Sequence, residues 1–330
     1  MKRHIPHDLV VEILSWLQIK HLWPLRLVSK TWFQLITANP EFANLHFDRS
    51  KNNTNPSILA WKFQNKLSFY LATDYTLCDK AIALEFPFYY DTEVCGVSKG
   101  LICLFHAENN EVCILNPFTN DSITFSSLPI PSRRFPGYSI YNTFGFGFDH
   151  SSNKFKLIRF FGEYRNLEYY ISQVSVYTLG KDSMWRTIDE DPGVCVRTMP
   201  NIVVSRALHW LTFTRDDDSS IYKILAFDLK DEVLRKLTLP NGVGVDNIME
   251  LGGLLCMPDS FKLPDIEIWA MEEYGVVTSW AKKFRIDRRL DTHFLHSNLC
   301  VLGLAHEGKM IVIEDHKYPI LYNLESKSVF

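Results

Sequence analysis

Four short segments contain residue types that catalytic or metal-binding sites use. Residues 145–148 read Gly-Phe-Gly-Phe, which resembles part of a nucleotide-binding loop, and His306-Glu307 begins like the helix of a zinc protease. Asp149, His150 and Ser151 bring together the three residue types of a hydrolase triad, while residues 216–218 are three consecutive aspartates that could attract calcium.

None of these segments has the spacing that its chemistry requires. The glycine pair lacks the third glycine of a dinucleotide loop, and Gly-Lys-Met follows Glu307 in place of a second histidine one helical turn later. Three adjacent residues in a turn do not form a nucleophile–base–orienter line, and the aspartate run lacks the alternating ligands and turn glycine of a calcium loop. We therefore predict no catalytic residue, no metal ligand and no cofactor, and we expect a protein that is not an enzyme.

The tryptophans are the remaining candidates for ligand contact. Trp61, Trp185, Trp210, Trp269 and Trp280 could stack on a sugar or a peptide, but they lie in strand-like runs. Large aromatic side chains in such runs are more often part of a core, so we favour a packing role. The sequence identifies no residue that binds a substrate.

The composition is that of a globular, β-rich protein. The 330 residues are 46% hydrophobic and 22% charged, which argues against long disorder, and the aromatic share of 14% favours strands. A net charge of -3 with scattered basic residues predicts no nucleic-acid partner. The seven cysteines form no CxxC pair, so we expect buried, reduced thiols.

The first residues imitate a signal peptide because basic residues precede an apolar stretch. Asp8 and Glu12 interrupt that stretch, and no small-residue cleavage site follows. No apolar run approaches the length of a membrane span. We expect a protein of the cytoplasm, the nucleus or both, with no membrane partner.

The elements that would position a functional surface fall into two kinds. Apolar residues from Leu9 to Leu17 and from Leu22 to Ile36 recur at three- and four-residue steps, which predicts three short helices. Ser29 is expected to cap the third helix, from Lys30 to Thr37, and Pro40 to end it. So small a head cannot bury a sufficient core alone and should lean on a partner or on the rest of the chain.

From about Phe47 onward, short apolar runs alternate with polar turns. We assign residues 1–46 to the helical head, 47–57 to a linker and 58–330 to an all-β domain. Similar strand–turn–strand units recur from residue 98 onward, and repeats of roughly 40 to 50 residues predict a β-propeller of about six irregular blades. A large irregular β-sandwich is the alternative.

Residues 5–42, IPHDLVVEILSWLQIKHLWPLRLVSKTWFQLITANPEF, closely resemble an F-box. The runs GFGFDHSSNKFKLIRF, NPFTN and IWAMEEYGVVTSWAKKF resemble the type 1 F-box-associated domain of plant F-box proteins, a group that includes F-box/kelch-repeat-like and S-locus F-box-like proteins. Together these similarities cover most of the chain.

The resemblance implies a substrate-recognition subunit of a Skp-cullin-F-box ubiquitin ligase. Such a subunit binds a Skp-type adaptor, and through it a cullin and a RING subunit, and recruits a target protein for ubiquitination and proteasomal degradation. The residues that the motif places at or behind the adaptor interface are Pro6, Leu9, Ile13, Leu14, Leu17, Leu22, Leu25, Val28 and Trp32. The competing interpretation is that some apolar residues, above all Ile13, Leu35 and Ile36, pack within the protein.

The sequence departs from the F-box pattern at several positions. Ile5 replaces the usual leucine, His21 stands where serine is common, and Trp23-Pro24 follows where the family often has leucine and arginine. Pro24 is acceptable if the second helix begins close to His21. The sequence ends at Phe330, about where relatives carry a further strand-bearing segment, so we expect incomplete or altered propeller closure.

These departures keep alternatives open. The chain could be a carbohydrate- or protein-binding propeller that acts outside a ligase, or a degenerate family member. A propeller enzyme is a further alternative from another class.

Overall fold

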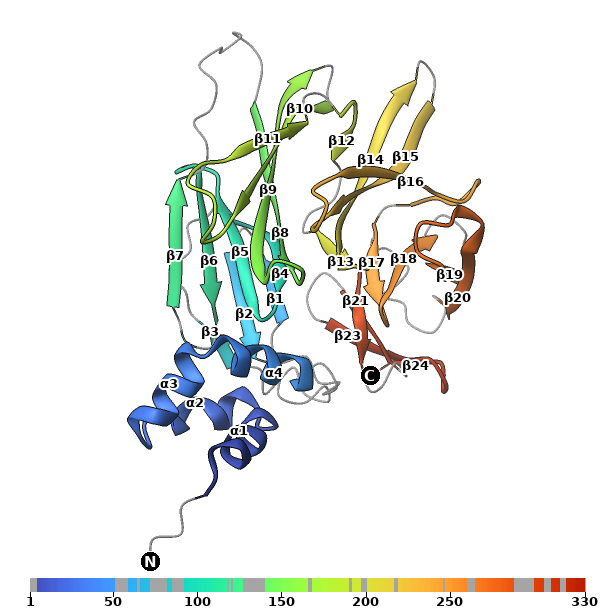
Figure 1. Cartoon of the computed structure of the whole chain (residues 1–330). Coiled ribbons are helices and arrows are strands. Elements are labelled where there is room, and N and C mark those ends of the chain that lie inside the picture. The colour runs from blue at the N-terminus through green and yellow to red at the C-terminus, as the bar shows by residue number, and fades with distance from the viewer. Residues whose placement is uncertain are drawn as a thin grey trace, which may run out of the picture.

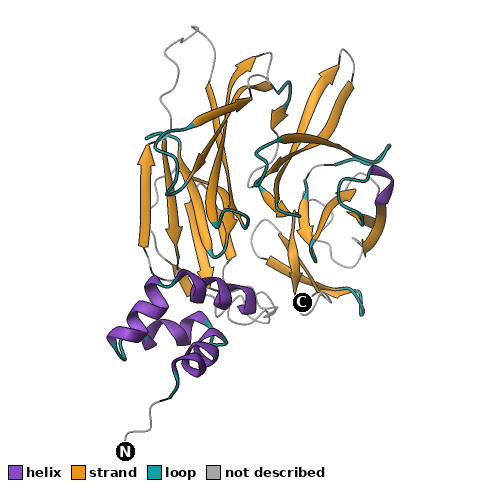
Figure 2. Ribbon diagram, viewed as in Figure 1, coloured by secondary structure: helices purple, strands orange, loops and turns teal. Residues whose placement is uncertain are grey.

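The computed structural model describes residues 5–50, 59–63, 66–71, 82–84, 92–117, 119, 121–126, 140–165, 168–189, 192–196, 201–216, 219–245, 247–259, 265–287, 300–305, 310–314 and 319–329. The four α-helices gather at one end of the molecule, and the rest of the described residues form strands and loops with one short 3-10 helix, Val277–Ser279, before β20 (Trp280–Asp287) (Figure 2). No helix in these ranges is both long and apolar enough to cross a membrane.

The helical head contains four helices rather than the three that the sequence predicted. They are α1 (His7–Ser15), α2 (Ile19–Leu25), α3 (Lys30–Ala38) and α4 (Pro40–Ser50) (Figure 1). One buried residue from each helix builds the small core: Leu14, Leu22, Leu35 and Phe42. Ser29 caps α3 as predicted, since its hydroxyl accepts a hydrogen bond from the Trp32 amide at 3.1 Å.

The third helix ends before Pro40 as predicted, with Ala38 as its last residue, but the sequence analysis missed the fourth helix that begins at Pro40. Pro40 is the first residue of α4, a position where its missing N–H costs nothing, and the Asn39 side chain accepts a hydrogen bond from the Phe42 amide at 2.8 Å. Because α4 runs to Ser50, the predicted linker at 47–57 begins inside a helix. Its remaining residues, 51–57, lie outside the described ranges.

Pro24 lies near the end of α2 and not in its first turn. The sequence analysis required the helix to begin close to His21. It begins two residues earlier, at Ile19, so Pro24 falls beyond the first turn. Proline at the sixth position removes one helical hydrogen bond, and α2 ends one residue later at Leu25. Arg26 closes this end, because its guanidinium lies 4.0 Å from the Trp23 ring centroid and donates to the Trp23 carbonyl at 2.6 Å.

Six antiparallel sheets follow in the described part of the chain, in agreement with the prediction of about six blades. The first three are formed by β1 (Leu59–Phe63), β2 (Lys66–Leu71) and β3 (Ile82–Leu84); by β4 (Thr92–Ser98), β5 (Leu101–His106), β6 (Glu111–Asn116) and β7 (Asp121–Ser126); and by β8 (Ile140–Asp149), β9 (Lys154–Arg165), β10 (Glu168–Thr178) and β11 (Arg186–Asp189).

The other three sheets are formed by β12 (Cys195–Val196), β13 (Ile202–Val204), β14 (Ala207–Asp216), β15 (Ser219–Asp228) and β16 (Leu234–Thr238); by β17 (Met249–Leu251), β18 (Leu254–Asp259), β19 (Asp265–Met271) and β20 (Trp280–Asp287); and by β21 (Cys300–Ala305), β22 (Met310–Glu314), β23 (Pro319–Asn323) and β24 (Ser328–Val329). As in the first three sheets, each strand pairs with its neighbour in the chain, except that β12 and β13 both pair with β14.

The hydrophobic core lies between consecutive sheets. One cluster joins β4–β6 to β8 and β9, a second joins β9 and β10 to β14 and β15, and a third joins β14 and β15 to β18, β19 and β20. A fourth adds Tyr322 of β23 to the sheet β17–β20. Sheets that each pack against the next one in the chain are the arrangement of a propeller, in which no sheet carries a core of its own.

The Gly-Phe-Gly-Phe segment is part of strand β8, and its glycines serve close packing. A Cβ atom at Gly145 would lie 2.2 Å from the Trp210 ring of the following sheet. The Asn201 side chain accepts a hydrogen bond from the Phe146 amide at 2.8 Å and donates to the Phe146 carbonyl at 3.3 Å. Glycine at 145 therefore lets two sheets approach each other where a larger residue would hold them apart.

Candidate functional site

The structure divides the nine predicted adaptor-binding residues into three groups. Pro6, Leu9, Ile13 and Val28 are exposed; Leu17, Leu25 and Trp32 are half-buried; and Leu14 and Leu22 are buried in the head core. The competing interpretation of Ile13 was wrong, because its side chain is 57% exposed, whereas Leu35 and Ile36 do pack in the head. Four of the nine side chains are therefore exposed enough to contact a partner directly, and two can only support the surface from inside the head.

The head exposes more apolar surface than the prediction contained. Seven large apolar side chains are at least half exposed, and we refer to them as the head surface: Ile5, Leu9, Ile13, Trp16, Leu27, Val28 and Phe33. Single exposed apolar side chains are ordinary, but seven within 29 consecutive positions of a small head make this part of the chain a candidate interaction site.

Helix α1 presents two opposite faces. Leu14 faces the core and is 2% exposed, while Leu9 and Ile13, one helical turn apart, lie on the outer face. Trp16 continues that face beyond the last helical residue, Ser15. The helix is therefore apolar on both sides, and only one of them is covered by the rest of the head.

The connection from α2 to α3 presents the second exposed group. Leu27 and Val28 precede the Ser29 cap and are 76% and 61% exposed. Phe33 lies on α3 away from Leu35, which is buried. The sequence analysis missed Leu27 and Phe33, although the helical period that turns Leu35 inward also turns Phe33 outward.

An ion pair between α1 and α4 borders the head surface. The Arg49 guanidinium lies 2.7 Å from the Glu12 carboxylate and 4.6 Å from the Trp16 ring centroid, and the Trp16 indole donates to Glu12 at 3.1 Å. The hydrogen bonds from Arg49 and Trp16 lower the pKa of Glu12 below its usual value. These contacts hold the Trp16 ring in place beside the exposed α1 face.

The triad-like segment forms a structural turn. Ser151 donates both its amide and its hydroxyl to Asp149, at 2.9 and 2.6 Å, and the Ser152 hydroxyl donates to the same carboxylate at 2.7 Å. The serine is thus bonded directly to the carboxylate and not to a histidine base. Of the other enzyme-like segments, Asp216 ends strand β14, whereas residues 217–218 and 306–307 lie outside the described ranges.

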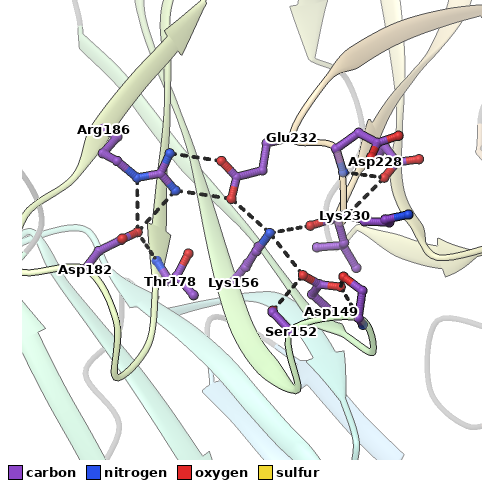
Figure 3. Close-up of polar contacts among 12 residues, drawn as sticks. Asp149, Ser152, Lys156, Thr178, Asp182, Arg186, Asp228, Lys230 and Glu232 are labelled. Carbon is purple, nitrogen blue, oxygen red and sulfur yellow. Dashed lines mark hydrogen bonds and ion pairs between the residues drawn. The ribbon is translucent and has the colours of Figure 1, made fainter.

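Asp149 also belongs to a polar cluster that ties the sheet β8–β11 to the turn after β15 (Figure 3). The Lys156 ammonium lies 3.2 Å from Asp149 and 2.9 Å from Glu232, and it donates to the Leu229 carbonyl. Arg186 extends the cluster, at 2.9 Å from Glu232 and 3.3 Å from Asp182.

The cluster keeps its carboxylates ionised. Burial alone would raise the pKa of Asp149, but the hydrogen bonds from Ser151, Ser152 and Lys156 outweigh it and hold the pKa well below its usual value. Burial acts in the same direction on Glu232, where contacts with Arg186 and Lys156 lower the pKa instead. Because its two cations pair with three carboxylates across the sheet β8–β11 and the turn after β15, the cluster connects the two sheets.

The described cysteines, and the four β-domain tryptophans whose side chains the structure describes, are packing residues. Five free cysteines, at 95, 103, 113, 195 and 256, are buried, and burial raises the pKa of Cys256 to about 12. Trp210 and Trp280 are buried, and Trp185 and Trp269 pack against core clusters. Among the described residues, no group of three or more histidines, cysteines and acidic residues could hold a metal ion.

Comparison with known proteins finds two family matches. Residues 3–43 match the F-box domain, and residues 58–329 match the F-box associated beta propeller domain. Among curated relatives, F-box protein At3g07870 of Arabidopsis thaliana is 26% identical over 86% of this chain and 72% of its own length. F-box protein CPR1, also of Arabidopsis thaliana, is 26% identical over 98% of this chain and 83% of its own length.

A solved structure aligns more loosely. A chain of the mitotic checkpoint complex gives a TM-score of 0.39 at 11% identity, over 81% of this chain and 86% of that chain. The family matches are therefore the informative comparison. An F-box domain implies binding to a Skp1-type adaptor, and proteins that combine it with this β domain are generally non-catalytic receptors that recruit substrates. The chain belongs to the family of F-box proteins that carry an F-box associated beta propeller domain.

Proposed function

We propose that this chain is the substrate-recognition subunit of a Skp-cullin-F-box ubiquitin ligase, acting in the cytoplasm, the nucleus or both. Its head binds a Skp-type adaptor, which connects it to a cullin and a RING subunit, and its β domain binds a target protein for ubiquitination and degradation. The chain itself performs no chemistry. Its contribution is to hold a target lysine near a charged conjugating enzyme, so that transfer gains from proximity and orientation.

The observation that carries this proposal is the head surface. Leu9 and Ile13 on α1 and Leu27, Val28 and Phe33 around the start of α3 are all at least half exposed in a head that already has a core. Covering them with an apolar partner would remove a large area from water, which is the main source of affinity in such interfaces. Leu14 and Leu22 then support the surface from behind.

The target is proposed to bind at the edge of the β domain away from the head. The β4–β5 and β8–β9 turns lie at the head end, because Lys99 and Asn153 in these turns contact α4. Antiparallel pairing places the β5–β6 turn, the end of β9 and the start of β10 at the opposite edge, where β7 also ends and β8 begins. Loops at the edge remote from the adaptor can contact a target without competing with it.

The test compares exposed apolar residues of the head with an exposed apolar residue of the β domain. The double variant Leu9→Asp/Ile13→Asp places two carboxylates on the exposed α1 face and should lower affinity for a purified Skp-type adaptor by at least about tenfold, with an unchanged melting temperature. The matched control is Ile123→Asp on strand β7, which is 53% exposed and distant from the head in sequence.

Leu14→Asp is a poor probe of binding, because it would introduce a charge into the head core and unfold it. If the double variant binds the adaptor as tightly as the intact chain does, the head surface is not the docking site. If the folded, intact chain binds no Skp-type adaptor, the ligase role is refuted.

A further inference from the structure

Helix α4 contacts the head with one face and the β domain with the other. With 3.6 residues per turn, Phe42, His46 and Arg49 share one face, and Asn44 and Phe47 lie on roughly the opposite face. Figure 1 shows α4 between the other helices and the nearest strand ends. The helix is thus placed to transmit the orientation of one part of the molecule to the other.

The head-side face of α4 makes three kinds of contact with α1 and the residues after it. Phe42 is buried in the head core, the His46 ring nitrogen lies 2.8 Å from the Leu17 carbonyl, and Arg49 pairs with Glu12 at 2.7 Å. The Arg49 guanidinium also donates to the Glu12 carbonyl at 3.1 Å. An apolar contact, a backbone contact and an ion pair spaced along two helical turns prevent α4 from rotating on the head.

The opposite face is held by Lys99, in the two-residue turn between β4 and β5. Its ammonium donates to the Asn44 side chain at 2.5 Å and lies 5.3 Å from the Phe47 ring centroid and 3.7 Å from the Phe148 ring centroid. Phe148 belongs to β8, so one cation joins α4 to two sheets. Cation–π contacts strengthen when the ring and the ammonium are shielded from water, and Phe148 is buried.

A second contact sets the rotation of α4 about that point. The Asn44 amide donates to the Asn153 side chain at 3.3 Å, in the turn between β8 and β9. Lys99 and Asn153 both have positive φ angles, of 47° and 54°, so the tight turns themselves fix where the two side chains begin. Because two separate turns contact Asn44, they fix both the position of α4 on the β domain and its rotation about its own axis.

We infer that α4 is a rigid connection between head and β domain, and that Lys99 is a positioning residue for ubiquitin transfer. This inference rests on the proposed ligase function. Lys99 touches neither the adaptor nor the reacting atoms; it holds the target-binding edge at a constant orientation to the head surface. A flexible joint would lower the effective concentration of the target lysine at the conjugating enzyme without altering either binding step.

The experiment measures the distance between head and β domain in the full chain. Spin labels are attached through non-natural amino acids at two exposed positions, Gln34 on α3 and Thr124 on β7, which leaves the native cysteines untouched. Pulsed electron paramagnetic resonance then gives the distance distribution, with and without a purified Skp-type adaptor. The variants are Lys99→Met and Asn44→Ala, and the matched control is Lys236→Met, an exposed lysine on strand β16.

The intact chain and the control should give one narrow distance peak. Lys99→Met and Asn44→Ala should lose that peak and give a broad distribution, while the melting temperature and the adaptor affinity remain those of the intact chain. A narrow peak in both variants, or a broad distribution in the intact chain, overturns the inference. The inference is also overturned if the distance distribution broadens only in a variant that has lost its cooperative unfolding transition, because Lys99 would then be needed for folding and not for orientation. Failure of the intact chain to bind an adaptor refutes the proposed function instead, because the distance measurement does not depend on it.

Discussion

Replacement of Lys156 by methionine should destabilise the β domain more than any other change of a lysine in strand β9. The lysine side chain is 5% exposed and contacts the Asp149 and Glu232 carboxylates at 3.2 and 2.9 Å. Methionine fills a similar volume but removes the charge, which leaves two largely buried carboxylates without that cation. Removal of one partner from a buried ionic group costs about 3–5 kcal/mol.

The contacts that remain favour the lower end of that range. Asp149 keeps its hydrogen bonds from Ser151 and Ser152, and Glu232 keeps Arg186 at 2.9 Å. A loss of about 3 kcal/mol, at roughly 2–4 °C per kcal/mol for a domain of this size, lowers the melting temperature by roughly 6–12 °C. Thermal unfolding followed by calorimetry or circular dichroism at neutral pH measures this shift.

Lys154→Met is the matched control, because Lys154 lies two residues away on the same strand and makes a single exposed hydrogen bond to the Gly180 carbonyl at 3.0 Å. Its effect should stay within about 0.5 kcal/mol. If Lys156→Met unfolds at the temperature of this control, the cluster contributes no stability between the sheets and the reasoning fails.

The pH dependence gives a second check on the same cluster. The pKa values of Asp149, Asp182 and Glu232 lie below their ordinary values of 3.8 and 4.5, so these groups stabilise the folded state above those values. That stability is lost as pH falls through the lowered pKa values, because the folded carboxylates must then be protonated. Without Lys156, the pKa values of Asp149 and Glu232 move back upward. The difference in free energy of unfolding between the intact protein and Lys156→Met should therefore be smaller at about pH 3 than at pH 7.

Two further substitutions test the packing and the buried charge of the β domain. Gly145→Ala places a methyl group 2.2 Å from the Trp210 ring and should destabilise by about 1–3 kcal/mol in a denaturant titration; an unchanged midpoint would show that the sheets can separate freely. Arg159→Met should leave the melting temperature unchanged or raise it. The buried Arg159 guanidinium has one nitrogen without a hydrogen-bond partner, and burial lowers its pKa to about 10, so the charge is costly to bury. A lower melting temperature would mean that the hydrogen bond to Asn142, at 2.7 Å, and the contact with Phe161 outweigh the cost of burying the charge.

Local sequence signals predicted the elements of the head and of the β domain well. Apolar spacing located α1 and α3, Ser29 was identified as a cap, and the recurring strand–turn units indicated about six sheets. These features depend on neighbours within a few residues, through helical period, capping and turn chemistry, so a single sequence contains them. The same reasoning placed Pro40 correctly after the third helix but missed the fourth helix that begins there, because proline at the start of a helix and proline after the end of one look alike in sequence.

The division of the head into core and surface was decided by tertiary structure. Ile13 and Leu14 are adjacent and equally apolar, yet one is 57% and the other 2% exposed. Helical period shows that α1 has a broad apolar stripe, but which edge of that stripe is covered depends on where α2, α3 and α4 pack. For the same reason the sequence could not tell which of the nine predicted residues lie at the adaptor interface and which, such as Leu14 and Leu22, support it from behind, and it passed over Leu27 and Phe33.

By itself, the sequence determined that a small helical head with surplus apolar surface precedes a β domain of repeated sheets, and which family these parts resemble. Tertiary structure alone decided which side chains form the head surface, how α4 joins the two parts, and how residues as distant as Asp149, Arg186 and Glu232 meet around Lys156. The physical reason is the range of the forces that act. Period, caps and turns are local along the chain, whereas burial and ion pairing depend on contacts between segments that only the folded chain brings together.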